Sequence, residues 1–222
     1  MIVREIGGAY TGDRAAALAG VPRSTVYYWA RHGHLVPSAS ISPRLWSFAD
    51  LLALRTLYWL RRPKKKFDRE IPASSMPKIM RALERLRALN LDLFEDDYCV
   101  VGVTLTGDIT LNAKDLPLQR VAGQLVEPQI IDVLAPFEGL EGTKGPDLRK
   151  PRQTLRIIPR KLSGAPHIGG TRLPTQPLYV LRERGYSVAE LAKLYPFASL
   201  DALGESLDLE SQLHANMLLK AA

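Results

Sequence analysis

The segment that decides the fold is residues 10–37, which read YTGDRAAALAGVPRSTVYYWARHGHLVP. Thr11 is a good N-cap for a helix through the alanine-rich run, and Gly20 ends that helix because glycine readily adopts the left-handed conformation. Pro22 suits the first turn of a second helix, which we expect to end at Gly33. Two short helices joined by a glycine-containing turn predict a helix-turn-helix unit.

The second helix is expected to have one buried and one exposed face. Val26 and Trp29 lie three residues apart and predict the buried stripe. The other face carries polar and aromatic residues, namely Arg23, Ser24, Thr25, Tyr27, Tyr28 and Arg31. The second helix of such a unit enters the DNA major groove, where arginine binds guanine and hydroxyl groups suit phosphates. We therefore predict that these six residues bind DNA.

A small hairpin and a third helix are expected to follow. Residues 35–46 contain a stretch rich in Ser, Ala and Pro, which predicts a wing with a loose tip. Ser47 and Asp50 suit a variant of the capping box at the start of a helix, and Pro63 forces a break after it. The run of three lysines at 64–66 is interpreted as a solvated linker.

Residues 10–62 resemble the N-terminal DNA-binding domain of MerR-type regulators. The matching features are the run AAxLAGVPRSTVYYWxRxGxLVP and, after it, RxWSFADLLALR. The resemblance implies that the helix beginning near Pro22 contacts DNA bases and that Arg44 and Trp46, around the wing, contact phosphates. No long dimerising helix and no effector-binding cysteine cluster follow in the sequence, which disfavours a metal-sensing role.

The middle of the chain predicts one helix and a β-hairpin. The helix is expected to begin at Ser75, because apolar residues then recur at helical spacing as far as Leu89. Residues 98–105 and 109–111 are rich in β-branched residues and flank a turn, which predicts a hairpin. Residues 138–150, with three glycines and a proline, predict an exposed linker.

The C-terminal segment predicts a second helix-turn-helix unit. Residues 157–175 read IIPRKLSGAPHIGGTRLPT, and a helix over 176–184 is expected to end at Gly185. Ser187 then begins a capping box for the next helix, and Ser199 caps the last one. The planar guanidinium of Arg172 suits a carboxylate or a phosphate. Whether Arg172 braces the fold or binds a partner stays open at this point.

Residues 155–213 resemble a domain found in VapB-like antitoxins. The pattern is SGxPxIxGTRLP, then a helix, then RGYSVAELAKLYPF. The resemblance implies a protein that binds its own promoter as an autorepressor and neutralises a PIN-domain ribonuclease toxin. It also implies that Gly170, Thr171 and Arg172 are partner-binding or structural residues. Residues 149–161 and 207–219 are candidate segments for contact with the acidic site of the toxin.

Charge favours three parts along the chain. The net charge is +7 over residues 1–70, −4 over 71–145 and +4 over 146–222. This asymmetry favours a polyanion-binding N-terminal part. We predict a MerR-like winged helix-turn-helix domain at 1–70, a linker helix with a small β-containing middle region at 71–145, and an antitoxin-type helix-turn-helix domain at 146–222.

Several function classes are excluded or disfavoured. The single cysteine, Cys99, excludes an internal disulfide and a cysteine-based zinc site. No apolar run approaches the roughly 18 residues that a membrane span needs. The sequence has no Ser/His/Asp arrangement, paired carboxylate motif or phosphate loop. We therefore expect a cytoplasmic protein with no catalytic residue, cofactor, metal or membrane contact, and we interpret the acidic residues 95–97 as a solvated loop.

We expect a mainly α fold with small β elements, and a homodimeric, non-enzymatic antitoxin that binds operator DNA. The homodimer follows because two half-sites one helical turn apart require two-fold symmetry. Two alternatives stay open. One is a stand-alone MerR-like transcriptional regulator whose middle region senses a small molecule, and the other is an adaptor that holds RNA or an acidic protein.

Overall fold

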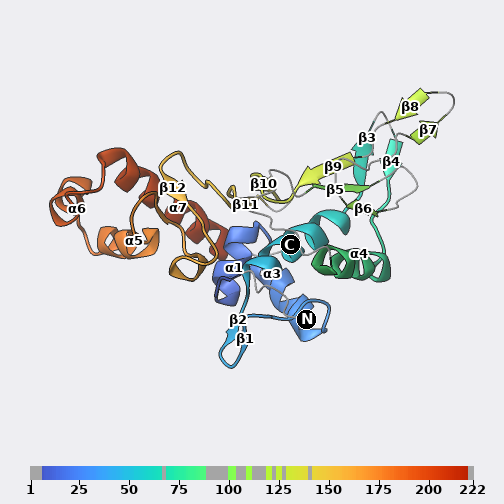
Figure 1. The fold of residues 1–222 in the computed structure, drawn as a ribbon, viewed down its shortest axis with the longest axis horizontal. Helices are drawn as coiled ribbons and strands as arrows, with labels where there is room; N and C mark the ends of the chain where they lie inside the picture. Colours follow the sequence, from blue (N-terminus) through green and yellow to red (C-terminus); the bar gives the residue numbers. More distant parts are fainter. Residues whose placement is uncertain are drawn as a thin grey trace. The chain divides into compact units, whose positions relative to one another are not determined.

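The computed structural model describes residues 7–66, 69–88, 100–103, 109–111, 119–121, 124–126, 129–139 and 142–219. These residues form a mainly α fold with small antiparallel strand pairs, which confirms the predicted fold class (Figure 1). The described residues form two compact units, one within 55–134 and the other from 7–54 together with 135–219. The division into three domains, at 1–70, 71–145 and 146–222, stays a prediction.

Helices α1 (Gly12–Ala19) and α2 (Arg23–Arg31) form the helix-turn-helix at the predicted positions. The Thr11 hydroxyl accepts a hydrogen bond from the backbone N–H of Arg14 at 3.3 Å. Gly20 ends α1 in the left-handed conformation, with a φ of 69°. Pro22 is the N-cap of α2 instead of a residue of its first turn. Local capping therefore explains both helices, as the sequence indicates.

The wing and the third helix also form as predicted. Strands β1 (Ser40–Ile41) and β2 (Arg44–Leu45) pair antiparallel. Helix α3 (Phe48–Leu60) begins with the capping box variant and ends before Pro63. In that box, Ser47 donates its backbone N–H to the Asp50 carboxylate at 2.8 Å, and the Ser47 hydroxyl accepts from the Asp50 N–H at 3.2 Å.

The C-terminal segment contains three helices that follow a short strand pair. The elements are β12 (Leu155–Arg156), the 3-10 turn η2 (Leu162–Gly164), β13 (His167–Ile168), α5 (Thr175–Glu183), α6 (Val188–Leu194) and α7 (Leu200–Leu218). Ser187 and Glu190 form the predicted capping box of α6, and the Ser199 hydroxyl caps α7. Helix α7 packs against α5 and also against α1 (Figure 1).

A buried ion pair connects α1 with α7. The two terminal nitrogens of Arg14 lie 2.5 and 2.7 Å from the two carboxylate oxygens of Glu210. The two side chains are only 14% and 4% exposed. Thr175, the first residue of α5, also donates its hydroxyl to Glu210. One carboxylate thus joins the helix-turn-helix to two helices of the C-terminal segment.

The prediction of an exposed linker at 138–150 is wrong in the described part of this segment. Strand β10 (Phe137–Glu138) pairs antiparallel with β11 (Lys144–Gly145). Thr143 and Leu148 are fully buried. The glycines and the proline here serve a tight hairpin that packs into the core, so composition alone misidentifies the segment.

The reason for this burial is contact with elements that are distant in sequence. The Thr143 hydroxyl donates to the backbone carbonyl of Gly20 at 2.7 Å. Asn216 of α7 accepts from the backbone N–H of Lys144 at 2.9 Å. A Cβ on Gly20 would lie 2.6 Å from the backbone nitrogen of Gly145, so the two chains approach closely because glycine stands there.

In the part that the structure describes, the unit within residues 55–134 contains the end of α3, helix α4 and short strands. Its elements after α3 are β3 (Lys64–Lys66), β4 (Arg69–Ile71), α4 (Met76–Ala88), β5 (Val100–Val103), β6 (Ile109–Leu111), β7 (Gln119–Val121), β8 (Gln124–Val126) and β9 (Gln129–Asp132). Strands β3 and β4 pair, β7 and β8 pair, and β5 lies between β6 and β9, all antiparallel. The predicted helix and hairpin are confirmed.

The linker expected at 64–66 is wrong, because these three lysines form a strand. Lysine is common on edge strands, where its charge opposes pairing with other chains. Cys99 and the acidic residues 95–97 lie outside the described residues. No helix in the described part of the chain is long and apolar enough to cross a membrane.

We predict that Glu210→Ala lowers the free energy of unfolding by about 3–5 kcal/mol, because it leaves the Arg14 charge buried without its partner. Asp208→Ala, which removes the exposed partner of Arg152, should cost at most about 1 kcal/mol. The double replacement Arg14→Met with Glu210→Met should cost less than Glu210→Ala, since no unpaired charge remains. Urea unfolding measures the free energy of unfolding of all three variants. Equal losses of stability for Glu210→Ala and Asp208→Ala would contradict the stabilising role of the buried Arg14–Glu210 pair.

Candidate nucleic-acid interface

One face of α2 is exposed and carries the residues predicted to bind DNA. Val26 and Trp29 are buried on the opposite face. Tyr27 and Tyr28 are 44% and 54% exposed. The exposed or half-buried positions of the outer face are Arg23, Ser24, Thr25, Tyr27, Tyr28 and Arg31. Successive helical turns bring residues separated by three or four positions to the same side, so these side chains share one surface.

The wing adds Arg44 to the candidate interface but not Trp46. Arg44 is exposed on β2. Trp46 is 3% exposed, and its backbone exchanges two hydrogen bonds with Tyr10, at 2.8 and 2.9 Å. Its indole therefore belongs to the core at the base of the wing. This burial corrects the expectation that Trp46 contacts phosphate.

This part of the chain has a one-sided charge composition. Residues 14–49 contain four arginines and two histidines, and no Asp or Glu. Arg14 is held by Glu210, whereas Arg23, Arg31 and Arg44 are exposed. Such a surface attracts the phosphate backbone of nucleic acid, and its binding weakens as salt rises.

Two histidines that the sequence does not predict as DNA-binding residues, His32 and His34, lie beside Tyr28. The ring centroid of His32 lies 4.1 Å from that of Tyr28, and the His34 ring lies 6.1 Å from that of His32. His32 Nδ1 is 2.8 Å from the backbone carbonyl of Tyr28. The spacing from 28 to 32 is one helical turn, which is the signal that would have found this pair.

Asp13 of α1 holds two of the predicted DNA-binding side chains. Its Oδ1 forms an ion pair with Arg23 Nε at 2.7 Å and accepts a hydrogen bond from the Tyr27 hydroxyl at 2.9 Å. The Arg23 guanidinium lies 5.5 Å from the centre of the Tyr27 ring. Partial burial raises the pKa of Tyr27, and the Asp13 carboxylate raises it further. The periodicity of α2 does not point to Asp13, because Asp13 lies in the preceding helix.

Two glycines and a threonine shape the loop before α5. Gly164 and Gly170 have positive φ angles of 78° and 74°. The Thr171 hydroxyl donates to the carbonyl of Ile168 at 2.9 Å and closes the turn. Arg172 is exposed, and within the described residues it makes no hydrogen bond or ion pair. Gly170 and Thr171 thus shape the loop, while Arg172 faces solvent.

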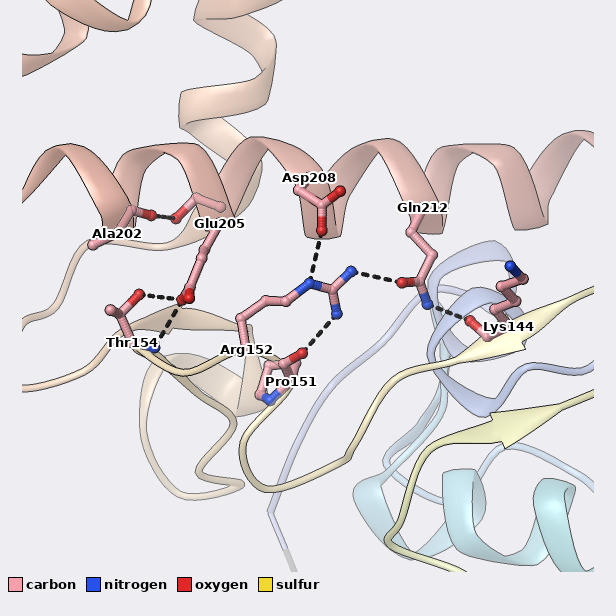
Figure 2. A network of polar contacts seen from close by, with 9 residues as sticks. Lys144, Pro151, Arg152, Thr154, Ala202, Glu205, Asp208 and Gln212 are labelled. Carbon is pink, nitrogen blue, oxygen red and sulfur yellow. Dashed lines mark hydrogen bonds and ion pairs between the residues drawn. The ribbon is translucent and has the colours of Figure 1, made fainter.

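A second polar network holds the segment before β12 against α7 (Figure 2). Arg152 binds Asp208 at 2.8 Å through Nε and Gln212 at 2.6 Å through Nη2. The Glu205 carboxylate accepts from the backbone and the hydroxyl of Thr154 at 2.7 and 2.5 Å. Burial alone would raise the pKa of Glu205, but the hydrogen bonds from Thr154 and Gln153 together with the charge of Arg152 lower it. Arg152 is therefore a structural residue.

Comparison with known proteins finds one family and a set of regulators. Residues 156–208 match the family described as a protein of unknown function, DUF433. The chain is 29% identical over 160 residues to an uncharacterized HTH-type transcriptional regulator of Mycobacterium bovis, an alignment that covers 66% of each chain. Two proteins of the same description from Mycobacterium tuberculosis match equally. The chain therefore spans 66% of the length of these relatives. No solved structure matches.

The glycine-rich loop before α5 also contains a buried histidine, His167. Burial lowers the pKa of His167, and the nearby charges of Lys161 and Arg156 lower it further. His167 is fully buried on β13, and its Nδ1 is 3.0 Å from the carbonyl of Ala165. Its Nε2 has no hydrogen-bond partner among the described residues. The neutral ring is therefore the form that the fold favours.

We predict that the wild-type protein loses stability as the pH falls below about 6.5, the ordinary pKa of histidine. Below that value His167 binds a proton in the unfolded chain but stays neutral in the folded chain, so stability falls. The loss of stability is complete once the pH lies below the lowered pKa of His167 in the folded chain. His167→Gln should flatten this part of the profile. Urea unfolding between pH 7.5 and 5 measures both, and parallel profiles of the two proteins would contradict the role of His167.

Proposed function

We propose that the protein is a sequence-specific DNA-binding transcription regulator. The observation that carries the proposal is the outer face of α2, where Arg23, Tyr27 and Tyr28 are exposed above the buried Val26 and Trp29. The exposed arginines of this part of the chain, Arg23, Arg31 and Arg44, support it. The names of the relatives, all HTH-type transcriptional regulators, support it as well.

The proposed binding mode inserts α2 in the major groove. The N-terminal residues of the second helix contact base edges in this motif. Arg23 and Ser24 are the first two residues of α2. Arg31 lies at its end and Arg44 on the wing, where both suit phosphates. We propose that a homodimer binds two half-sites, because the motif contacts one half-site at a time.

We predict that Arg23→Ala weakens binding to the preferred DNA site by about 1–3 kcal/mol and reduces discrimination at one base pair. Arg44→Ala should weaken binding to all sequences alike and reduce the salt slope by about 1. Arg184→Ala removes an exposed arginine of the C-terminal segment and serves as the charge-matched control. Fluorescence anisotropy at several salt concentrations measures each, and unchanged discrimination in Arg23→Ala would contradict the placement of α2.

A second candidate function is neutralisation of a PIN-domain ribonuclease toxin. The observation that favours it is a set of exposed apolar side chains, Leu194, Phe197 and Leu200, which we name the 194–200 cluster. Phe197 and Leu200 are 65% and 61% exposed. The cluster lies at the junction of α6 and α7, within the stretch that matches DUF433. Exposed apolar side chains that gather on one surface are typical of protein–protein interaction sites.

The structure changes which segment is the best candidate for the toxin contact. In residues 149–161, Arg152 is bound to Asp208 and Gln212. In residues 207–219, Leu209 and Leu213 are fully buried. The exposed Arg172 offers a basic group that suits an acidic ribonuclease site. We therefore propose the 194–200 cluster and Arg172 in place of those two segments.

We predict that the wild-type protein, purified from its native cells with nuclease present, carries a small stoichiometric partner with ribonuclease activity that the complex inhibits. Phe197→Asp should lose the partner and keep its DNA binding, because it alters only the 194–200 cluster. Intact-mass analysis and a ribonuclease assay measure these outcomes. A wild-type protein that binds DNA and carries no partner would favour the stand-alone regulator, in which a small molecule changes DNA affinity.

A further inference from the structure

Asp13 is an unexpected residue on a surface that we propose to face DNA. Residues 7–54 contain two carboxylates, Asp13 and Asp50. Asp50 is buried and accepts hydrogen bonds from Ser38 and Ser47. Asp13 is 37% exposed and lies next to the first residue of α2. A carboxylate at this position repels DNA phosphates, so its presence requires a compensating role.

The contacts of Asp13 indicate what that role is. Its Oδ1 is paired with the Nε of Arg23, which is one edge of the guanidinium. The opposite edge carries Nη1 and Nη2, the pair of groups that binds guanine O6 and N7. Within the described residues, Asp13 and Tyr27 are the partners of Arg23. The ion pair thus holds the side chain and leaves its guanine-binding edge available.

Tyr27 completes this arrangement from the same helix as Arg23. Its hydroxyl donates to the same Asp13 oxygen, and its ring lies under the guanidinium. A Cβ on Gly12 would lie 2.9 Å from the Tyr27 hydroxyl, so glycine at the start of α1 makes room for it. The ion pair with Asp13 and the contact with the face of the Tyr27 ring therefore restrict the Arg23 side chain, which would otherwise be flexible.

We propose that Asp13 is a specificity-determining positioning residue, which orients Arg23 for one guanine in the preferred DNA site. The proposal rests on the proposed function, since it needs α2 in the major groove. An arginine that is already oriented loses less conformational freedom when it binds DNA. The resulting gain in affinity applies only where Nη1 and Nη2 meet the O6 and N7 atoms of a guanine. Asp13 therefore lowers affinity for DNA in general and raises the preference for guanine at one position.

The test begins with selection of the preferred site from a random DNA pool by the full-length wild-type protein. Dissociation constants are then measured for that site, for its single-base-pair variants and for an unrelated duplex. The variants are Asp13→Ala, Asp13→Asn and Arg23→Ala. Asp201→Ala is the matched control, because Asp201 is also the second residue of a helix and has no ion pair within the described residues.

The expected result has two opposite parts. Arg23→Ala loses discrimination at one G·C pair by about 5- to 150-fold, the range for a bidentate arginine contact. Asp13→Ala loses about 5-fold or more at the same base pair, while its affinity for the unrelated duplex rises because a negative charge is removed. Asp13→Asn retains more discrimination than Asp13→Ala, since its amide oxygen still accepts a hydrogen bond. Asp201→Ala matches the wild type.

Three other outcomes would overturn the inference. Tighter binding of Asp13→Ala to every duplex with unchanged discrimination would make Asp13 a repulsive charge only. Lower thermal stability with unchanged discrimination would make it a stabilising residue of α1 only. Loss of discrimination in Asp13→Ala at a base pair that Arg23→Ala does not affect would separate the two residues. If the wild type selects no sequence at all, the proposed function itself fails, which is a distinguishable result.

Discussion

The buried ion pair between Arg14 and Glu210 is the contact on which the arrangement of the helix-turn-helix depends. Burial of two charges is favourable only when the geometry is good and other groups satisfy the remaining oxygens. Both conditions hold here, because Arg14 is bidentate and Thr175 donates to the same carboxylate. Asn216 and Thr143 then donate to the carbonyls of Ala17 and Gly20, at the C-terminal end of α1.

The parts of the fold that the sequence predicts are those that depend on near neighbours. Thr11, Ser47, Ser187 and Ser199 each act on a backbone group three residues away, so their caps are visible in the sequence. Residues 138–150 have no such local signal. Their burial depends on partners near Gly20 and in α7, which only the folded chain brings together.

The same distinction explains the candidate site. The outer face of α2 follows from a period of 3.6 residues, which any reader of the sequence can apply. Trp46 was assigned to the interface through a resemblance that carries no information about burial, and the Tyr10 pairing places it in the core. Asp13 was missed because its partners lie across a turn. The available signal was that Asp13 is the only Asp or Glu in residues 7–49 of the sequence.

Helix α7 links the two proposed functions within one compact unit. It carries Leu200 of the 194–200 cluster at its start, and Glu210 and Asn216, which hold α1, farther along. A partner that moved α7 relative to α1 would have to separate the buried Arg14–Glu210 pair, which is costly. We therefore expect a bound partner to leave the geometry of the helix-turn-helix intact. The partner would then affect DNA binding by covering the outer face of α2 or by changing the spacing of the two protomers in the proposed homodimer.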